Sequence, residues 1–213
     1  MKKKYLSLVC VGVCFLLSSC KIELSSVLKV SELLSSETKN VNGIVSVEIS
    51  SCYSYEDSRQ PSSSLLEVQQ KITNIIPSAE YVQCYSKAMN SYAEFKINMN
   101  VKNNLNLPSS GITLVNDGKG TLGLHIPNNI ANQIKESLYG ENDVSMIFTI
   151  INDTDTTAKF NVLGAFINNK PHPLETEVIL HPQQNANIKL SDVAKEYILE
   201  GNNFVILKPS STN

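Results

Sequence analysis

The stretch SYAEFKINMNV, residues 91–101, alternates polar and apolar side chains along its length. A period of two places successive side chains on opposite faces of a β-strand. One face of this segment is apolar and consists of Ala93, Phe95, Ile97, Met99 and Val101. The other face is polar, so the segment predicts a long antiparallel strand with one face on a core and the other in solvent.

A strand, a helix and a second strand are predicted directly before this segment. Residues 45–49 alternate in the same way. The helix is predicted to begin at Ser64, because Ser64 and Glu67 have the spacing of a capping box, in which the two side chains satisfy each other's exposed backbone donors. Pro77 ends this helix, and residues 79–86 form the second strand.

The chain after residue 110 predicts more antiparallel sheet. Asn and Gly within residues 116–120 tolerate positive φ and predict a hairpin turn between two apolar runs. A helix capped by Asn128 or Asn129 follows and ends at Gly140. The remaining predicted elements are strands at residues 144–151, 158–167, 176–182 and 203–209, and a helix at residues 193–200 capped by Ser191-Asp192. The predicted fold class is α+β, with largely antiparallel sheet and about three short helices.

Residues 1–20 predict export and lipid attachment. Lys2–Lys4 precede an apolar run, residues 5–17, which is too short to span a bilayer and has the length of a secretory h-region. The motif Leu17-Ser18-Ser19-Cys20 resembles the lipobox of bacterial lipoproteins. This resemblance implies that the Cys20 sulfur carries diacylglycerol, that residues 1–19 are removed as a signal peptide, and that the new amino terminus is acylated. The alternative is an ordinary signal peptide or membrane anchor.

The same resemblance implies an address in the cell. Two acyl chains suffice for stable membrane anchoring, whereas one chain binds only marginally. In the Gram-negative lipoproteins that this segment resembles, Asp directly after the lipidated Cys favours the inner membrane. Here that residue is Lys21, which implies the outer membrane, with the folded part facing the periplasm or the surface.

The composition divides the chain after the signal peptide into three parts. Residues 20–43 are rich in Ser and Lys and predict a tether, although their scattered apolar side chains indicate that part of it packs on the domain. Residues 44–105 contain the strand–helix–strand unit and the long strand. Residues 106–213 predict a second antiparallel α+β module, unless the two modules form one continuous domain.

Cys52 and Cys84 are the cysteines that remain after Cys20. In an oxidising compartment such a pair predicts a disulfide. Closing the loop between them should contribute about 3–4 kcal/mol in the chain-entropy model. A redox or metal-binding pair is the alternative, but the sequence contains no C-x-x-C motif and no His near either cysteine.

Composition and motifs argue against several kinds of activity. The formal net charge is −2 and the lysines are dispersed, which predicts no binding to nucleic acid. His125, His172 and His181 do not form a metal-binding motif, and no nucleophile elbow or phosphate-binding loop is present. The sequence therefore predicts no catalytic residue, metal or cofactor. A pair of carboxylates brought together by the fold, as in an anchored cell-wall hydrolase, is the alternative.

Tyrosine is the one residue type that is enriched around the two cysteines. The residues are Tyr53, Tyr55, Tyr81, Tyr85 and Tyr92. Because tyrosine is favoured at protein interfaces, these five residues form the candidate interaction patch. Packing of the same rings around the disulfide is the alternative interpretation.

Two runs, EISSCYSYEDSRQPSSSLLEVQQKI and SAEYVQCYSKAMNSYAEFKINMNV, are similar to a group of small enterobacterial and phage-borne lipoproteins of undefined function. The resemblance covers about residues 20–105 and carries no catalytic residue. It implies a prophage or phage product placed in the host envelope. The expected function is that of a non-catalytic, lipid-anchored protein that binds an envelope protein, for example in phage exclusion. A membrane-anchored hydrolase acting on cell-wall material is the alternative.

Overall fold

The computed structural model describes residues 21–37, 39–102, 111–137 and 143–210. The strands are β1 (Ile22–Lys29), β2 (Lys39–Ile49), β3 (Glu80–Lys87), β4 (Asn90–Lys102), β5 (Thr113–Asn116), β6 (Leu122–His125), β7 (Val144–Ile151), β8 (Ala158–Val162), β9 (Ala165–Ile167), β10 (Lys170–His172), β11 (Thr176–Leu180), β12 (Asn185–Leu190) and β13 (Phe204–Pro209). The helices are α1 (Val30–Leu33), α2 (Ser63–Ile75), α3 (Asn128–Ser137) and α4 (Asp192–Leu199). One 13-stranded sheet contains all the strands, in the order β10-β9-β12-β7-β1-β2-β4-β5-β6-β13-β8-β11, with β3 on β4.

Strand β4 has the structure that its alternating sequence predicts. It pairs with β2 along nearly its whole length, from Ser91 opposite Ile49 to Val101 opposite Lys39. Its other edge is shared, because β3 pairs with the first half of β4 and β5 with its last residues. The five apolar side chains between residues 93 and 101 are buried, which confirms the predicted core face.

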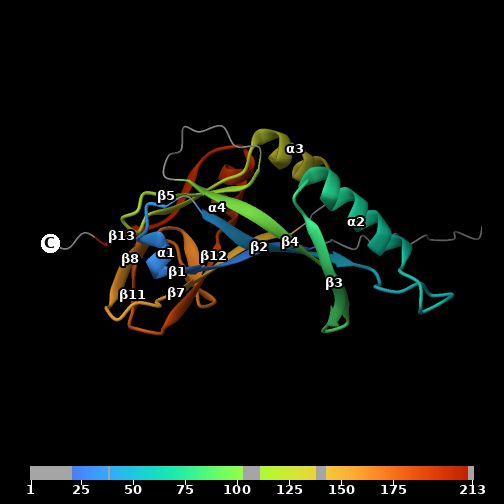
Figure 1. The fold of residues 1–213 in the computed structure, drawn as a ribbon, viewed down its shortest axis with the longest axis horizontal. Coiled ribbons are helices and arrows are strands. Elements are labelled where there is room, and N and C mark those ends of the chain that lie inside the picture. Colours follow the sequence, from blue (N-terminus) through green and yellow to red (C-terminus); the bar gives the residue numbers. More distant parts are fainter. Residues whose placement is uncertain (1–20, 38, 103–110, 138–142, 211–213) are drawn as a thin grey trace, which may run out of the picture.

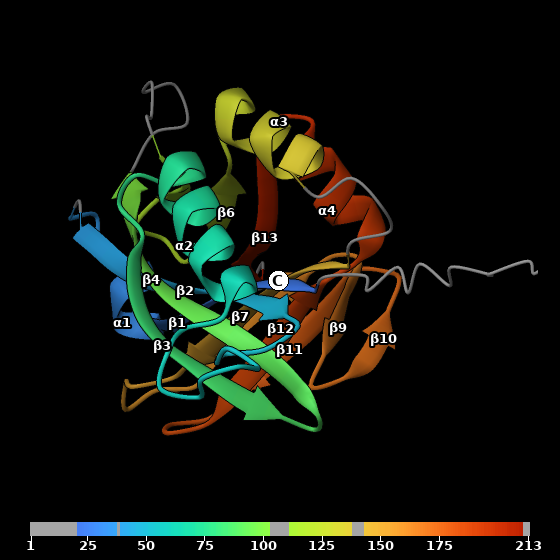
Figure 2. The same cartoon turned by 90° about the vertical axis from the view of Figure 1, so that its right-hand side faces the viewer.

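The three longer helices cover one face of the sheet (Figures 1 and 2). Helix α2 packs on β2, β3 and β4, helix α4 packs on β7 and β13, and α3 contacts both helices. The core between helices and sheet includes the fully buried side chains of Phe95, Phe148 and Ile130. Among the described strands, only the pairs β1–β7 and β4–β5 are parallel, so the predicted α+β class with largely antiparallel sheet is confirmed.

The predicted tether over residues 20–43 is wrong for most of its length. Residues 22–29 form β1, which lies in the middle of the sheet between β2 and β7. Leu24 and Leu28 point into the core, and the strand is covered on both edges. Strand β1 and its two neighbours also join the parts of the chain before and after residue 105 into one sheet, so the two predicted modules are not separate.

Other differences concern element boundaries. Helix α2 is capped by Ser62 rather than by Ser64, and the helix starts at Ser63. The strand predicted at residues 158–167 is interrupted at Gly164, whose φ of +57° separates β8 from β9.

Strand β12 had not been predicted, although its buried side chains alternate along residues 186–190. The predicted helix end at Gly140 lies outside the described residues. The hairpin turn at residues 116–120 is confirmed by the pairing of β5 with β6.

Candidate functional site: the ribbon β3–β4 and its disulfide

The ribbon formed by β3 and the first half of β4 extends beyond the part of the sheet that the helices cover (Figure 1). Strand β3 pairs with β4 from Glu80 opposite Lys96 to Lys87 opposite Asn90. After β2 the chain leaves the sheet and returns as helix α2, which packs against this ribbon. The ribbon and the segment after β2 therefore present their side chains together.

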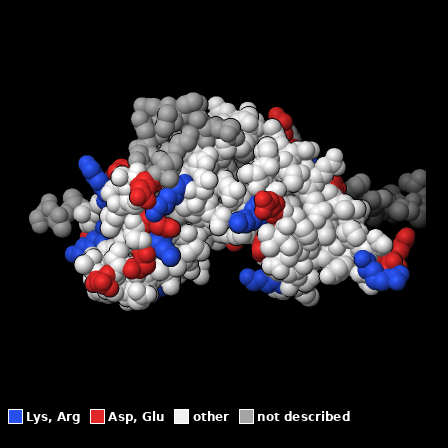
Figure 3. All heavy atoms as spheres, in the orientation of Figure 1, with Lys and Arg blue, Asp and Glu red and all other residues white. Residues whose placement is uncertain are grey.

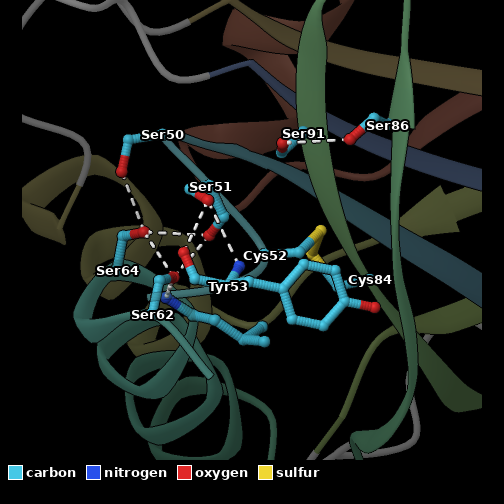
Figure 4. The surroundings of a disulfide bond; sticks show 10 residues. Ser50, Ser51, Cys52, Tyr53, Ser62, Ser64, Cys84, Ser86 and Ser91 are labelled. Atoms are coloured by element: carbon cyan, nitrogen blue, oxygen red, sulfur yellow. Dashed lines mark hydrogen bonds between the residues drawn. A yellow bond between two sulfur atoms is a disulfide. The ribbon is translucent and has the colours of Figure 1, made fainter. Parts of the chain in front are cut away.

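The predicted disulfide between Cys52 and Cys84 is present, with 5.6 Å between the two Cα atoms. It joins the segment after β2 to the middle of β3 (Figure 4). Cys52 is buried and Cys84 is half-buried on the core face of the ribbon, opposite Ala93. The disulfide consequently fixes the position of the ribbon against the rest of the domain.

A group of serines fixes the segment after β2 to the start of helix α2 (Figure 4). The Ser62 hydroxyl accepts a hydrogen bond from the Leu65 N–H at 3.1 Å and donates one to the Ser51 carbonyl. The Ser51 hydroxyl donates to the Tyr53 carbonyl at 2.7 Å. Because these bonds hold the backbone on both sides of Cys52, the loop that carries Tyr53 has a defined conformation.

The serine group supports a stability prediction. Ser62→Ala removes the cap of α2 and leaves the Leu65 N–H and the Ser51 carbonyl without this partner, so we expect the free energy of unfolding to fall by about 1–2 kcal/mol. Ser63→Ala is the control, because Ser63 is exposed and should change stability by less than about 0.5 kcal/mol. Chemical denaturation of both variants measures the difference, and equal values would contradict the capping role of Ser62.

The five predicted tyrosines do not form one patch. Tyr85 lies opposite Tyr92 on the outer face of the ribbon, where the two rings stack with centroids 5.6 Å apart. Tyr81 lies opposite Phe95 on the core face, and their rings meet edge to face with centroids 5.8 Å apart. The two groups face opposite sides because a β-bulge between Tyr81 and Gln83 shifts the register by one residue.

Three of the tyrosines are exposed near the disulfide. Tyr53 is 60% exposed, its ring lies beside the disulfide in Figure 4, and Tyr55 is fully exposed. Both border a shallow hollow of about 610 Å³ that is otherwise lined mainly by serines. Partial burial raises the pKa of Tyr81, and the nearby Tyr53 phenol raises the pKa further. The Tyr81 phenol therefore remains a neutral hydrogen-bonding group around neutral pH.

Two further exposed apolar residues lie on the ribbon and had not been predicted. Val82, at the bulge, is 49% exposed, and Met89 is fully exposed in the turn between β3 and β4. Ala88 and Met89 form this two-residue turn with φ angles of 49° and 70°. Two-residue turns of this kind strongly favour Asn-Gly, because both residues have positive φ. Neither Ala nor Met provides a turn signal, so the sequence alone did not identify this position.

We define the ribbon surface as the exposed side chains of Tyr53, Tyr55, Tyr81, Val82 and Met89. Charged residues in Figure 3 lie in small groups that contain both signs, and a broad uncharged area lies between these groups. One ion pair lies in the loop before α2, where Arg59 contacts Asp57 at 3.0 Å and lowers the pKa of that carboxyl group. The five side chains of the ribbon surface are thus aromatic or apolar, and the exposed charged side chains of Glu80, Lys87 and Lys96 belong to the same ribbon.

The three histidines lie in separate places. His125 ends β6, its Nδ1 atom is buried without a hydrogen-bond partner, and burial lowers its pKa. His172 lies in β10 with Nδ1 3.3 Å from the Thr176 hydroxyl, and His181 follows β11 with Nδ1 3.2 Å from the Thr157 hydroxyl. Within the part of the chain that the structure describes, no group of three His, Cys, Asp or Glu side chains is placed to hold a metal ion.

The described chain begins next to the ribbon. The Lys21 carbonyl accepts a hydrogen bond from the Glu48 N–H at 2.8 Å, and Glu48 lies opposite Tyr92 in β4. Tyr92 lies opposite Tyr85 in β3. Since neighbouring strands are about 4.8 Å apart, Lys21 is roughly 14 Å from the outer strand of the ribbon. Cys20, the predicted lipidation site, is the residue before Lys21 and lies outside the described residues.

No helix in the described ranges combines the length and the apolar character needed to cross a membrane. A family model described as a domain of unknown function (DUF7424) matches residues 22–211. No curated protein and no solved structure matches the chain. The matched range starts directly after the first described residue and includes every described strand and helix.

Proposed function

This chain belongs to the family described as a domain of unknown function (DUF7424), and, because that description names no activity, we propose from the residues themselves that it is a lipid-anchored protein of the bacterial envelope. In this proposal the ribbon surface binds another envelope protein without catalysis. We infer an outer-membrane address from Lys21, and we infer from the resemblance of residues 20–105 that the gene is carried by a prophage.

The observation that carries the binding proposal is the turn between β3 and β4. Ala88 and Met89 both have positive φ, which costs on the order of 1 kcal/mol or more per non-Gly residue. The Met89 side chain is fully exposed and makes no compensating contact with the core. A strained turn that presents an apolar side chain is explained if a partner binds that side chain, because Met adapts to varied apolar surfaces.

The position of the ribbon supports a partner in the membrane. The ribbon surface and Lys21, the residue after the predicted lipid site, lie at the same end of the sheet, and the disulfide links the ribbon to the segment after β2. A rigid surface loses little conformational entropy on binding. A lipid-anchored surface also meets a membrane protein at a high effective concentration. The preferred partner is therefore an integral envelope protein with an exposed apolar site.

The anchor is tested on protein made in a Gram-negative host and purified from its envelope. Intact-mass spectrometry is expected to show a chain that begins at Cys20 and carries diacylglycerol and an amino-terminal acyl group. Cys20→Ala should move the protein from the membrane fraction to the soluble fraction. An unmodified amino terminus, or membrane residence that survives Cys20→Ala, would show that the anchor proposal is wrong.

The binding surface is tested with the double substitution Ala88→Asn/Met89→Gly. This change provides the preferred turn residues, so we expect the free energy of unfolding to rise by about 1 kcal/mol. Co-purification of cross-linked envelope proteins should nevertheless fall several-fold, because the exposed Met side chain is lost.

The matched control for the double substitution is Ile179→Ser, which removes a 45% exposed apolar side chain on β11. This control should leave the co-purified proteins unchanged. Equal recovery with the wild type and the turn variant would contradict the binding role. Release of muropeptides from purified peptidoglycan would favour an anchored hydrolase instead.

A further inference from the structure

A second apolar surface lies on the other side of the chain start. This surface is a groove of about 580 Å³, which we call the α4 groove. It is enclosed by helix α4, the turn between β8 and β9, the hairpin β9–β10 and the start of β13. Its apolar walls include Leu163, Phe166, Pro173, Val193, Tyr197 and Phe204. Figure 2, which looks onto this end of the sheet, shows α4, β9 and β10 on one side and β3 on the other.

The rim of the α4 groove exposes large apolar side chains to solvent. Val193 is 81% exposed and Leu174, directly after Pro173, is 76% exposed. Two polar groups in the walls already have partners: the Ser191 hydroxyl accepts from the Ala194 N–H at 3.3 Å, and His172 Nδ1 contacts the Thr176 hydroxyl. The groove is thus suited to hydrocarbon, and exposure of such a patch indicates a binding surface.

The sheet register places the α4 groove close to the start of the chain. Ile22 pairs with Val144, the first residue of β7. Lys189 in β12 pairs with Ile147, and continuing that register puts Ser191 beside the start of β7, two strand spacings or about 10 Å from Ile22. The buried Lys195 of α4 confirms the proximity, because its Nζ donates to the Val144 carbonyl at 2.6 Å.

We propose that the α4 groove is the surface through which the anchored domain rests on the lipid bilayer, with Leu163, Leu174 and Val193 inserted among the acyl chains. This inference rests on the proposed anchor at Cys20. The anchor makes the encounter intramolecular, since the bilayer then lies within about 10–15 Å of the groove. Burial of the exposed side chains releases water from apolar surface. The lipid and the groove together fix the orientation of the domain, which a single flexible attachment point leaves free.

The charges near the groove favour zwitterionic over anionic phospholipid. Asp192 and Glu196 lie on the exposed side of α4, and the Asp192 carboxylate contacts Lys195 Nζ at 2.6 Å. The hydrogen bond from Lys195, followed by the charge of the same ammonium group, lowers the pKa of Asp192. The carboxylate is therefore ionised around neutral pH. Because Lys195 offsets the charge of Asp192, the exposed Glu196 is the acidic group of α4 that anionic headgroups would repel, so zwitterionic headgroups suit this face better.

The test uses the chain from Cys20 onward, because all described strands and helices begin after that residue. With Cys52 and Cys84 joined, the Cys20 thiol can be coupled to maleimide-phosphatidylethanolamine in phosphatidylcholine nanodiscs that contain nitroxide-labelled acyl chains. Methyl NMR is expected to show several-fold stronger paramagnetic broadening for Val193, Leu163 and Leu174 than for Val27. Val27 is the internal control, because it is an exposed valine in the half of β1 that is distant from Ile22.

Two variants complete the test of the α4 groove. Val193→Asp/Leu174→Asp should reduce the broadening of Leu163 to the level of Val27, whereas Val27→Asp should leave it unchanged. The first variant is expected to fold, because an acidic residue in the first turn of α4 is favourable. Equal broadening of the groove and Val27 in the wild type would overturn the proposal. Since the lipid is attached chemically, this result is independent of whether cells lipidate Cys20 and of what the ribbon binds.

Discussion

Cys84→Ser is expected to lower the free energy of unfolding by about 3–4 kcal/mol, one of the two largest effects that we predict. Cys84 is bonded to Cys52 across a sequence separation of 32, so removing the bond frees a long loop in the unfolded chain. The folded state loses the link that holds the segment with Tyr53 against β3. Chemical denaturation with and without a reducing agent measures the loss.

The control for this prediction is Cys52→Ser/Cys84→Ser. Both substitutions remove the same bond, so the double variant should cost little more than Cys84→Ser alone, and added dithiothreitol should lower the stability of the wild type but not of the variants. A wild type that is indifferent to reduction would contradict the structural role. Because Ser62 still fixes the loop, the reduced protein should lose binding at the ribbon surface only in part.

Phe95→Ala should cost about 3–5 kcal/mol, because Phe95 is fully buried and its loss leaves a cavity beneath the ribbon. Phe95 lies on the core face of β4 and supports the Tyr81 ring from the side. The cavity therefore affects both the core and the exposed ring that belongs to the ribbon surface. Thermal and chemical unfolding measure the loss of stability.

Phe166→Ala is the matched control for Phe95→Ala. Phe166 is 38% exposed at the α4 groove, so its removal should cost clearly less than that of Phe95. A double-mutant cycle of Tyr81→Leu with Phe95→Leu should give a coupling of about 0.5–1.5 kcal/mol, the range for an edge-to-face pair. Equal costs for the two phenylalanines, or no coupling, would contradict this account of the ribbon.

Several elements could be predicted because their information is local. The apolar face of β4, the turn between β5 and β6 and the caps of α4 depend on residues within a few positions of one another. Ser191 caps α4 as predicted, and Gly201, with φ of +84°, follows its carboxyl-terminal end. The disulfide was predicted from chemistry rather than from geometry, since the predicted exported compartment and a single remaining pair allow one connection.

Strand β1 could not be predicted because its pattern is ambiguous. Leu24, Val27 and Leu28 have the spacing of a helix as well as that of a strand, and the residues between Leu24 and Val27 are both Ser. Its partner strand β7, which begins at Val144, is distant in the sequence, and β1 and β7 are parallel. Such pairing depends on the whole sheet, so no local pattern indicates it.

The candidate site, too, could be predicted only in part from the sequence. The sequence identified the tyrosines around the cysteines, but it placed them in one patch. Tyr81 and Tyr85 are four residues apart and would share a face in a regular strand. The bulge between Tyr81 and Gln83 places them on opposite faces. The strained turn at Met89 was missed because neither of its residues is a turn former.

The amino-acid sequence by itself determined the period of clearly amphipathic elements such as β4, the turn between β5 and β6, the pair of cysteines and the predicted lipid site, because each depends on neighbouring residues or on simple chemistry. Only the tertiary structure decided which surfaces meet at the start of the chain. The ribbon and the α4 groove come from segments far apart in the sequence, and they lie on either side of Ile22 because sheet register aligns β1 with β2 and β7. Register is a cooperative property of paired strands, and no single segment encodes it.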